Sequence, residues 1–597
     1  MADQTLIHDD IKLYTTAEKF YLEPTINPTE IMVIDRVSGE SCVKNFNEVK
    51  IPIPPNAYKP VCGFLGTIKL ISGHYLIVAK YRICMGKING HDIYQLAGHE
   101  LIPFSRSNTH LTSKQIDENS TYERMVSAAL QTPGIYFSYG YDLTHTAQRL
   151  HSVSADFHKM SMSSRAEPRF LWNGFVLKDY AHAQFARFAL PLVQGFVSIK
   201  HISVGGHQMA LSVVSRRAVT RAGTRLFMRG VDAEGHVANF VETEQIVERG
   251  GERCSFVQTR GSIPLFWTQY PNLKYKPSMS LSPQDHVAAY TRHLRDQQQR
   301  YGSQVLVNLI DQRGKEEALE QGYRACVAAA ALPGVRYEPF DFHAECHGMR
   351  YDRLRVLTDR IHHEQTEFGY FLSRGGTVLL RQSGVFRTNC VDCLDRTNVL
   401  QSELARRQLV EFLRSRQLVQ DGLPDHVMAV FREIWADHAD MISTQYSGTG
   451  ALKTDYTRTG KRTALGALKD GVNSLTRYYK NNFCDGFRQD ATDLFLGNYV
   501  VSEGEGHTAV CPLERRRDWK YITFPSVLLV ATAMFCASAL LPAEYGPRAL
   551  LQLLLCGAAA AAALLAVLQN GPTYVDWPRL HAGGLAAARA AAAAPSL

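Results

Sequence analysis

The chain has 597 residues, of which 45% are hydrophobic and 20% are charged, and its formal net charge is +8 at pH 7. At about 150 residues per domain this length allows two to four folded units, and the composition excludes disordered, collagen-like and coiled-coil proteins. A net charge this small on so long a chain does not indicate a nucleic-acid-binding protein, although it is compatible with anionic partners. The twelve cysteines are scattered along the chain, which is typical of reduced thiols facing the cytosol.

The first third of the chain is predicted to be rich in β-strands. Two apolar, β-branched runs flank the pair Ser72-Gly73, which is the pattern of a β-hairpin. After about residue 285 the pattern becomes helical, with segments such as 284–301 and 315–332. We therefore expect an α/β fold with a β-rich N-terminal subdomain, residues 1–180, followed by a catalytic subdomain, residues 181–500.

Two uncharged runs lie near the C-terminus, and each contains twenty residues: 522–541 and 549–568. A run of this length forms a helix of about 30 Å, which matches the hydrocarbon core of a bilayer. Residues 542–548 are long enough only for a turn, so the two runs are predicted to form a transmembrane hairpin. A pair of buried helices in a soluble protein is the alternative.

Basic residues indicate the orientation of this hairpin. Three arginines and one lysine precede the first run within residues 515–520, whereas the turn carries only Arg548. The rule that basic loops stay in the cytosol therefore places the large N-terminal part, a linker of residues 501–521 and the tail of residues 569–597 on the cytosolic side, and the turn in the lumen. The N-terminus has no basic and apolar leader, so no cleavable signal peptide is expected.

The most informative string is residues 387–398, Arg-Thr-Asn-Cys-Val-Asp-Cys-Leu-Asp-Arg-Thr-Asn. Cys390 and Arg396 are six positions apart, the spacing of cysteine-dependent phosphatases, and the flanking sequence predicts a strand–loop–helix unit. Amide N–H groups and the positive end of that helix would bind phosphate oxygens and favour the thiolate form of Cys390. Arg396 would hold two phosphate oxygens with its planar guanidinium.

Cleavage of a phosphoester also requires an acid that protonates the leaving alkoxide. Asp392 and Asp395 both lie in the loop; we favour Asp392 as the acid, whereas Asp395 fits a structural or substrate-binding role better. The remaining candidate substrate-binding residues are Thr397, Asn398, Lys453, Arg458, Lys461 and Arg462. The four basic ones fall within ten positions and would contact inositol phosphates or membrane headgroups, with a solvated basic loop as the alternative.

The pair Cys390 and Cys393 also fits two other kinds of site. A zinc site would need further ligands, for which His343, Cys346 and His347 are available. Because a metal would remove the free thiolate whose phosphate Arg396 would bind, we expect no metal and no other cofactor. A reversible Cys390–Cys393 disulfide would shield the nucleophile.

Residues 387–398 resemble, almost without departure, the signature of the Sac-domain phosphoinositide phosphatases. Further likeness to this family lies in residues 136–144, 221–225, 238–244, 340–343, 446–453 and 478–483. The resemblance implies a β-rich subdomain joined to an α/β catalytic subdomain, a phosphocysteine formed on Cys390, phosphate binding by Arg396 and proton donation by Asp392.

The hairpin further resembles that of a membrane-bound family member of the endoplasmic reticulum and Golgi. This resemblance implies hydrolysis of phosphatidylinositol monophosphates, chiefly the 4-phosphate and also the 3-phosphate, by an integral membrane protein. That member ends in a lysine-rich retrieval signal, whereas this chain ends in Ala-Ala-Ala-Pro-Ser-Leu, so retrieval by such a signal is not expected. Two alternatives stay open: a protein tyrosine or dual-specificity phosphatase, and a catalytically silent, lipid-binding membrane tether.

Overall fold

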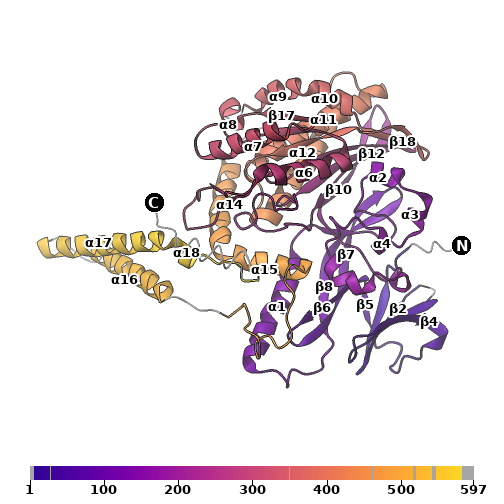
Figure 1. The fold of residues 1–597 in the computed structure, drawn as a ribbon, viewed down its shortest axis with the longest axis horizontal. Helices are drawn as coiled ribbons and strands as arrows, with labels where there is room; N and C mark the ends of the chain where they lie inside the picture. The colour runs from indigo at the N-terminus through magenta and orange to yellow at the C-terminus, as the bar shows by residue number, and fades with distance from the viewer. Residues whose placement is uncertain are drawn as a thin grey trace.

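The structure is a computed structural model that describes residues 6–26, 28–347, 350–459, 463–514, 519–540 and 546–580. Strands and helices form a mixed α/β body, and two long helices project from one end of it (Figure 1). The expected fold class, an α/β domain with a β-rich N-terminal part and a C-terminal helical hairpin, is confirmed.

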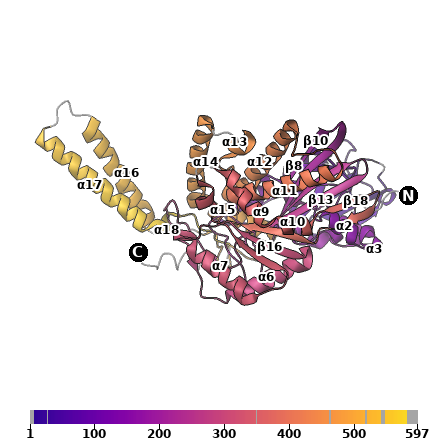
Figure 2. The same cartoon turned by 90° about the horizontal axis from the view of Figure 1, so that it is seen from above.

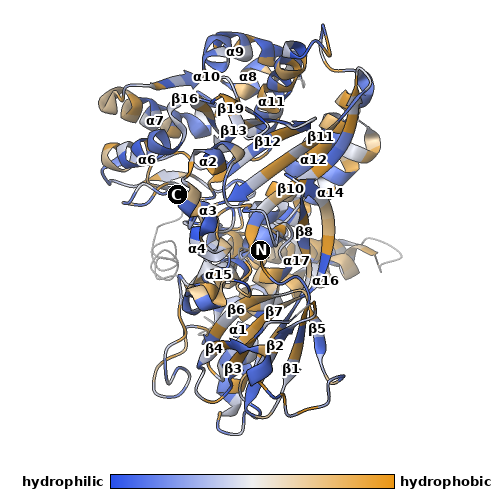
Figure 3. Ribbon diagram, turned by 90° about the vertical axis from the view of Figure 1, so that its right-hand side faces the viewer, coloured by the Kyte–Doolittle hydropathy of each residue, from blue (hydrophilic) through white to orange (hydrophobic). Residues whose placement is uncertain are grey.

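A five-stranded antiparallel sheet lies at one end of the molecule (Figure 3). Its strands, in spatial order, are β4 (Ser41–Asn45), β3 (Glu30–Asp35), β2 (Lys19–Pro24), β1 (Ile11–Thr15) and β5 (Lys59–Val61). Side chains two residues apart on a strand point to the same face, and Ile11 and Leu13 of β1 accordingly share one hydrophobic cluster with Phe64. This cluster packs the small sheet against the larger one.

The larger sheet has thirteen strands within the described residues. Its main path runs through β17 (Val335–Pro339), β16 (Ser303–Asn308), β20 (Gly384–Asn389), β13 (Glu252–Arg260), β12 (Val241–Arg249), β11 (His207–Arg217), β10 (Val193–Val204), β9 (Ile135–Phe137), β8 (His91–Pro103), β7 (Gly73–Ile88) and β6 (Gly63–Leu70). Two further strands, β18 (Phe371–Arg374) and β19 (Thr377–Leu380), branch from β13. A separate pair is formed by β14 (Trp267–Thr268) and β15 (Ser280–Leu281).

Pairing in the larger sheet changes from antiparallel to parallel along its length. The predicted hairpin around Ser72-Gly73 is the antiparallel pair β6–β7, whereas β17, β16, β20 and β13 are parallel neighbours. The short strand β9 pairs with both β8 and β10, so the sheet continues past residue 180 without a break. The division into two subdomains at that residue stays a prediction.

Helices cover the parallel part of the sheet, in agreement with the helical pattern of the sequence. The segments predicted at 284–301 and 315–332 are α6 (His286–Tyr301) and α7 (Glu317–Ala330), which share a hydrophobic cluster with β16 and β20. A second cluster joins α11 (Asp395–Ser415) and α12 (Asp425–Ser447) to β10 and β11. Shorter helices are α2 (Ala147–Ser152), α3 (Ala155–Lys159), α4 (Met162–Arg165), α5 (Gly174–Leu177), α8 (Phe342–Glu345), α9 (Leu354–Arg360), α10 (His362–Phe368) and α13 (Thr454–Thr459).

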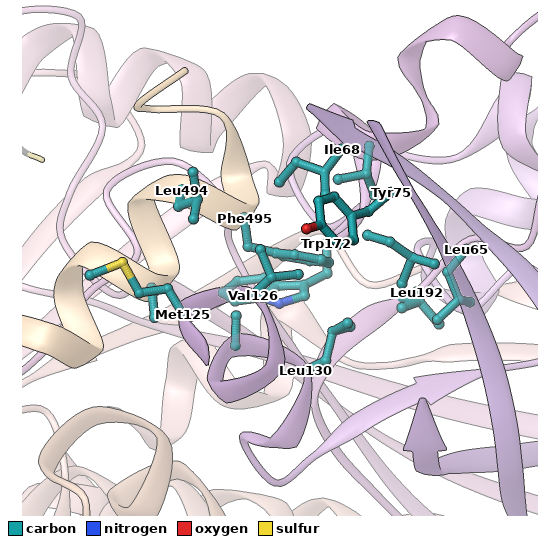
Figure 4. Close-up of a cluster of buried hydrophobic side chains, with 14 of the residues drawn as sticks. Leu65, Ile68, Tyr75, Met125, Val126, Leu130, Trp172, Leu192, Leu494 and Phe495 are labelled. Atoms are coloured by element: carbon teal, nitrogen blue, oxygen red, sulfur yellow. The ribbon is translucent and has the colours of Figure 1, made fainter. Parts of the chain in front are cut away.

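Two helices far apart in sequence, α1 (Ser113–Gln131) and α15 (Asp485–Leu496), pack against each other and join the β-rich N-terminal part to a C-terminal segment. Figure 4 shows Met125 and Val126 of α1 beside Leu494 and Phe495 of α15, in a cluster that also contains β6 and β7. The segment after α15, which the sequence assigned to a linker, packs on α1 as far as residue 514. Its buried Glu505 accepts a hydrogen bond of 2.5 Å from the Tyr122 hydroxyl.

The two apolar runs form the helices α16 (Lys520–Leu540) and α17 (Pro547–Gln569), which pack against each other and project away from the α/β body (Figure 2). Both are long and apolar enough to cross a membrane, and only 11% of the residues in either apolar window are buried. The chain then returns through α18 (Gly571–Tyr574) to the body. There the Asp576 amide donates to the Asn482 carbonyl at 2.7 Å and the Arg579 amide to the Asp490 carboxylate at 2.8 Å.

Candidate active site

The loop from Cys390 to Leu394 joins the end of β20 to the start of α11. This is the predicted strand–loop–helix unit. The loop lies at the carboxyl end of a strand with parallel neighbours on both sides, and the free N–H groups of the first turn of α11 are at its other end. Cys393 adopts a left-handed backbone conformation, with φ of 50°, which turns the loop tightly. The arrangement is suited to binding a phosphate group.

Cys390 is buried, with 3% of its surface exposed, and lies on the wall of a cavity of about 620 Å³. The Thr397 hydroxyl, in the first turn of α11, donates toward the Cys390 sulfur at 3.5 Å. A hydroxyl donor and a helix N-terminus both stabilise negative charge on sulfur. Cys390 is therefore placed to act as a nucleophile toward a group bound in the cavity.

Arg396 is held by carboxylates in this structure. Its guanidinium donates to both Glu316 carboxylate oxygens at 3.0 Å and to the Leu309 carbonyl at 2.9 Å, and Asp311 lies 3.3 Å away. Burial acts against the charge of Arg396, but nearby Cys390 and these carboxylates raise its pKa above the ordinary value. The guanidinium is fully charged and already forms the forked contact that a phosphate would offer.

Asp392 lies between two arginines. Arg229 approaches one carboxylate oxygen at 2.6 Å and Arg225 the other at 2.9 Å. Burial alone would raise the pKa of Asp392, but these two guanidinium groups lower it well below the ordinary range. Asp392 is thus ionised at neutral pH, which does not agree with the proton-donating role that we expected for it.

Asp395 has the opposite environment. Its carboxylate accepts a hydrogen bond of 3.1 Å from the Leu452 amide, and the side chain lines the same cavity as Cys390. Burial raises the pKa of Asp395 above the ordinary value, although nearby Arg477 acts in the other direction. A carboxyl group with a raised pKa is a better proton donor at neutral pH than the clamped Asp392.

The cavity wall is rich in basic groups. Its volume of about 620 Å³ lies in the range of small-molecule sites. The basic side chains on the wall other than Arg396 are Arg225, Lys274, Lys276, Lys453 and Arg477. Aromatic side chains of Tyr275 and Tyr478 add apolar surface beside them. This combination fits a polyhydroxylated ring that carries phosphate groups.

The candidate residues after the loop divide into two groups. Thr397 faces Cys390, as described. Asn398 also borders the cavity, but its amide donates to the Trp435 carbonyl at 3.0 Å and its oxygen lies 2.9 Å from His438, so it fastens α11 to α12. The structure therefore supports a positioning role for Asn398 rather than the direct substrate contact that we expected.

The basic stretch is only partly in the site. Lys453 lines the cavity, whereas Arg458 is paired with Asp437 at 2.8 Å and Asp440 at 3.1 Å on α12. Because both carboxylates hold it, Arg458 is not a free cation for substrate. Lys461 and Arg462 lie outside the described residues.

The sequence reasoning missed several residues of the site. Arg225 lies in a stretch of family likeness but was expected to belong to a basic surface stripe rather than to the site, and Lys274, Lys276 and Arg477 carried no local signal. Glu316, in the short helix η4 (Gly314–Glu316), lies 80 positions before Arg396 and was not anticipated.

The alternative readings of Cys390 and Cys393 find little support in the described part of the chain. There, no group of three or more His, Cys, Asp or Glu side chains gathers closely enough to hold a metal ion. Cys390 and Cys393 are both free thiols, and the Cys393 thiol donates to the Gly261 carbonyl at 2.9 Å. The Cys393 side chain thus attaches the loop to the backbone at Gly261, which directly follows β13.

Comparisons with known proteins agree with this site. A profile of the SacI homology domain matches residues 62–347. A Drosophila melanogaster protein named phosphatidylinositol-3-phosphatase SAC1 is 47% identical over 587 residues, which cover 97% of this chain and 98% of the relative. The chain belongs to the Sac-domain phosphoinositide phosphatase family. The resemblance drawn from residues 387–398 is therefore confirmed.

Other Sac proteins match over similar lengths. The Danio rerio protein named phosphatidylinositol-3-phosphatase SAC1-B is 44% identical over 582 residues, covering 96% of this chain and 98% of its own. The Saccharomyces cerevisiae phosphatidylinositol-3-phosphatase SAC1 is 35% identical over 580 residues, covering 92% and 90%. The profile match ends before Cys390, but these alignments extend over nearly the whole chain, so the Sac likeness includes both the loop and the apolar helices.

Proposed function

We propose that this Sac-family chain hydrolyses phosphatidylinositol monophosphates, chiefly the 4-phosphate and also the 3-phosphate, to phosphatidylinositol. The observation that carries the proposal is the position of Cys390, at the N-terminus of α11 on the wall of a basic cavity of about 620 Å³. The names of the relatives from Drosophila, Danio and Saccharomyces support a phosphatidylinositol phosphate as substrate. The preference for the 4-phosphate comes from the resemblance of the membrane hairpin.

The first chemical step forms a phosphocysteine. The Cys390 thiolate, stabilised by the Thr397 hydroxyl and the α11 N-terminus, attacks the phosphorus atom. A sulfur–phosphorus bond forms while the bond between phosphorus and the inositol oxygen breaks. Amide N–H groups of the loop stabilise the negative charge on the phosphate oxygens.

Arg396 must change partners for this step. In the structure Glu316 occupies both arms of its guanidinium. A bound phosphate offers the same two acceptor oxygens with more negative charge, so we propose that phosphate replaces Glu316 on Arg396. Glu316 and Asp311 then act as a resting counter-charge that keeps the guanidinium next to the cavity.

We assign the acid role to Asp395. Burial raises its pKa and so favours the protonated form, and in the proposed step this proton passes to the inositol oxygen as the phosphoester bond breaks. The resulting carboxylate then accepts a proton from the water that attacks the phosphocysteine. That attack releases inorganic phosphate and restores the Cys390 thiolate. Asp392, held by Arg225 and Arg229, orients the loop during both steps.

We also propose that α16 and α17 cross a membrane, with the α/β body and the segment after α17 on the cytosolic side. Their length, apolar composition and exposure support a membrane span. The chain after α17 docks on the body through Asp576 and Arg579, so both ends of the hairpin are on the same side. By the resemblance stated above, the membranes are those of the endoplasmic reticulum and Golgi.

The test measures phosphate release by the full-length protein from each phosphatidylinositol monophosphate and from a phosphotyrosine peptide, with and without a chelator. We expect turnover of the lipids, fastest for the 4-phosphate, and no loss in chelator. Cys390→Ser should abolish it, and acid quenching with labelled lipid should trap a phosphorylated wild-type protein. Faster turnover of the peptide would indicate a protein tyrosine phosphatase, and full turnover by Cys390→Ser would overturn the mechanism.

A further inference from the structure

Helix α14 (Ala464–Phe483) carries an apolar face that the described part of the protein does not cover. Its large apolar residues are Leu465, Leu468, Val472, Leu475, Tyr479 and Phe483, and their exposed fractions run from 40% for Phe483 to 76% for Leu465. On a helix with 3.6 residues per turn these six positions fall within about 80° of one another. They form one continuous stripe, which we call the α14 stripe. An exposed patch of this kind marks an interaction surface.

The opposite face of α14 belongs to the active site. Ser474, Arg477, Tyr478, Asn481 and Asn482 line the cavity that contains Cys390. The Tyr478 hydroxyl donates to the Leu273 carbonyl at 2.7 Å, which ties the helix to the loop that carries Lys274 and Lys276. Whatever binds the α14 stripe is therefore one helix diameter away from the reacting phosphate.

The position of α14 indicates what binds there. Figures 1 and 2 both show α14 at the end of the α/β body from which α16 and α17 project. If these two helices span a bilayer, as proposed above, the membrane surface lies at this end of the body. Trp519 and Tyr521, at the start of α16, are exposed aromatic residues of the kind that mark the headgroup level.

Charge near the stripe fits the same occupant. Lys469 is exposed on α14, and Lys274, Lys276 and Lys453 lie at the cavity next to it. Apolar residues along one side of a helix, with basic residues beside them, are the pattern of a helix that lies in a membrane interface. A protein partner on the same face would have to share that space with the lipid headgroups around α16.

We propose that the α14 stripe inserts into the interface of the bilayer that α16 and α17 span, and that this insertion brings the Cys390 cavity to the lipid headgroups. The inference rests on the proposed membrane span. It adds a lipid-binding element to the catalytic body itself, separate from the hairpin anchor.

The first experiment uses full-length protein in vesicles of phosphatidylcholine and phosphatidylserine with phosphatidylinositol 4-phosphate. The double variant Leu468→Glu/Leu475→Glu should lower kcat/KM on vesicle substrate at least tenfold, because carboxylates resist insertion beside anionic lipid. Its activity on a water-soluble short-chain analogue should stay within twofold of wild type. The control Val37→Glu, at a still more exposed position in the connection between β3 and β4, should change neither activity.

Unchanged vesicle activity of the double variant would overturn the proposal. If the double variant instead changed the oligomeric state in detergent while vesicle activity stayed normal, the α14 stripe would be a protein–protein interface. An absence of activity of the wild-type protein on both substrates would contradict the proposed function, and the insertion is then tested by a second measurement that needs no turnover.

That measurement places tryptophan in the stripe. Leu475→Trp in the full chain should show fluorescence quenched by lipids brominated in their acyl chains, beyond the quenching of the wild-type protein. Val37→Trp should show no added quenching. Equal quenching of the two tryptophan variants would show that α14 does not enter the bilayer. This result does not depend on whether the double glutamate variant folds.

Discussion

Two groups of buried charges in this protein resemble each other in composition but differ in their surroundings. In the middle of the large sheet, Arg216 of β11 is paired with Glu242 at 3.0 Å and Glu244 at 2.8 Å, and at most 3% of any of these side chains is exposed. At the cavity, Arg396 is paired with Glu316 and Asp311, which are 15% and 30% exposed. Both groups consist of one arginine and two carboxylates.

The exposure of the carboxylates distinguishes the two groups: the Arg216 group is closed off from solvent, whereas the Arg396 group borders the cavity. Arg216 has protein on every side, so its partners cannot be exchanged without unfolding the sheet. Arg396 has the cavity on one side, and in the proposed mechanism an incoming phosphate replaces Glu316. A buried ion pair is therefore a fixed structural contact in the first case and a charge held ready for substrate in the second.

The largest expected effect comes from breaking the interior group. Arg216→Met should lower the free energy of unfolding by about 3–5 kcal/mol, because it removes the guanidinium that pairs with the buried carboxylates of Glu242 and Glu244. Thermal unfolding of the full chain in detergent measures this as a clear fall in Tm. The matched surface control Arg432→Met, on the outer side of α12, should leave Tm nearly unchanged. Equal Tm values for the two variants would show that the interior group adds no stability.

The next largest effect concerns the cavity group and is catalytic. Arg396→Lys keeps the charge but loses the planar fork, so kcat/KM for the lipid should fall by about 10²–10³, a loss of about 2.7–4 kcal/mol of transition-state stabilisation. Tm should change much less than in Arg216→Met. A lysine variant with near-normal kcat/KM would contradict the forked contact with phosphate.

Asp392 in the loop and Asp395 at the start of α11 should respond differently to pH. We expect Asp395→Asn to lower kcat by about 10² and to remove the decline of kcat as pH rises through the raised pKa of Asp395, since that decline reports loss of the acid proton. A pH–rate profile of both proteins measures it. Retention of the same decline in Asp395→Asn would assign the acid to another residue.

Replacing Asp395 and Asp392 by asparagine should change Tm at pH 7 in opposite directions. The pKa of Asp395 is raised in the fold, so its favourable contribution exists at low pH and is lost as pH rises through that pKa; Asp395→Asn should therefore raise Tm at pH 7. The pKa of Asp392 is lowered, so its contribution exists at neutral pH and is lost only in strong acid. Asp392→Asn should accordingly lower Tm at pH 7, and shifts of the same sign would contradict these environments.

The smallest expected effect is on the resting partner of Arg396. Glu316→Gln removes the competing charge, so inorganic phosphate should inhibit this variant at concentrations about 3–10 times lower than wild type, corresponding to about 1 kcal/mol. Inhibition assays with the soluble short-chain substrate measure the change. Glu403→Gln is the matched control, because the Glu403 carboxylate accepts hydrogen bonds from Arg406 within α11 and does not line the Cys390 cavity. Weaker inhibition by phosphate would show that Glu316 helps to hold the anion.

Much of the scaffold of the site could be predicted because its signals are local. The apolar runs around Ser72-Gly73 became β6 and β7, and the loop between β20 and α11 has its predicted strand and helix. The segment after residue 500 is positioned by residues far away in the chain, so local signals did not predict its contacts. Its position between the last motif and the first apolar run suggested a linker, but Glu505 is buried and accepts a hydrogen bond from Tyr122, 383 positions earlier in the chain.

The loop between β20 and α11, the family and the two apolar helices could all be predicted from sequence, because a six-residue spacing, a signature string and a twenty-residue apolar run are properties of neighbouring residues. The packing of residues far apart in the chain sets which of Asp392 and Asp395 has the raised pKa, which carboxylate holds Arg396 and which face of α14 is exposed. These depend on burial and on the electric field of groups such as Arg225, Arg229 and Glu316. Folding alone brings such distant residues within a few ångströms of the loop.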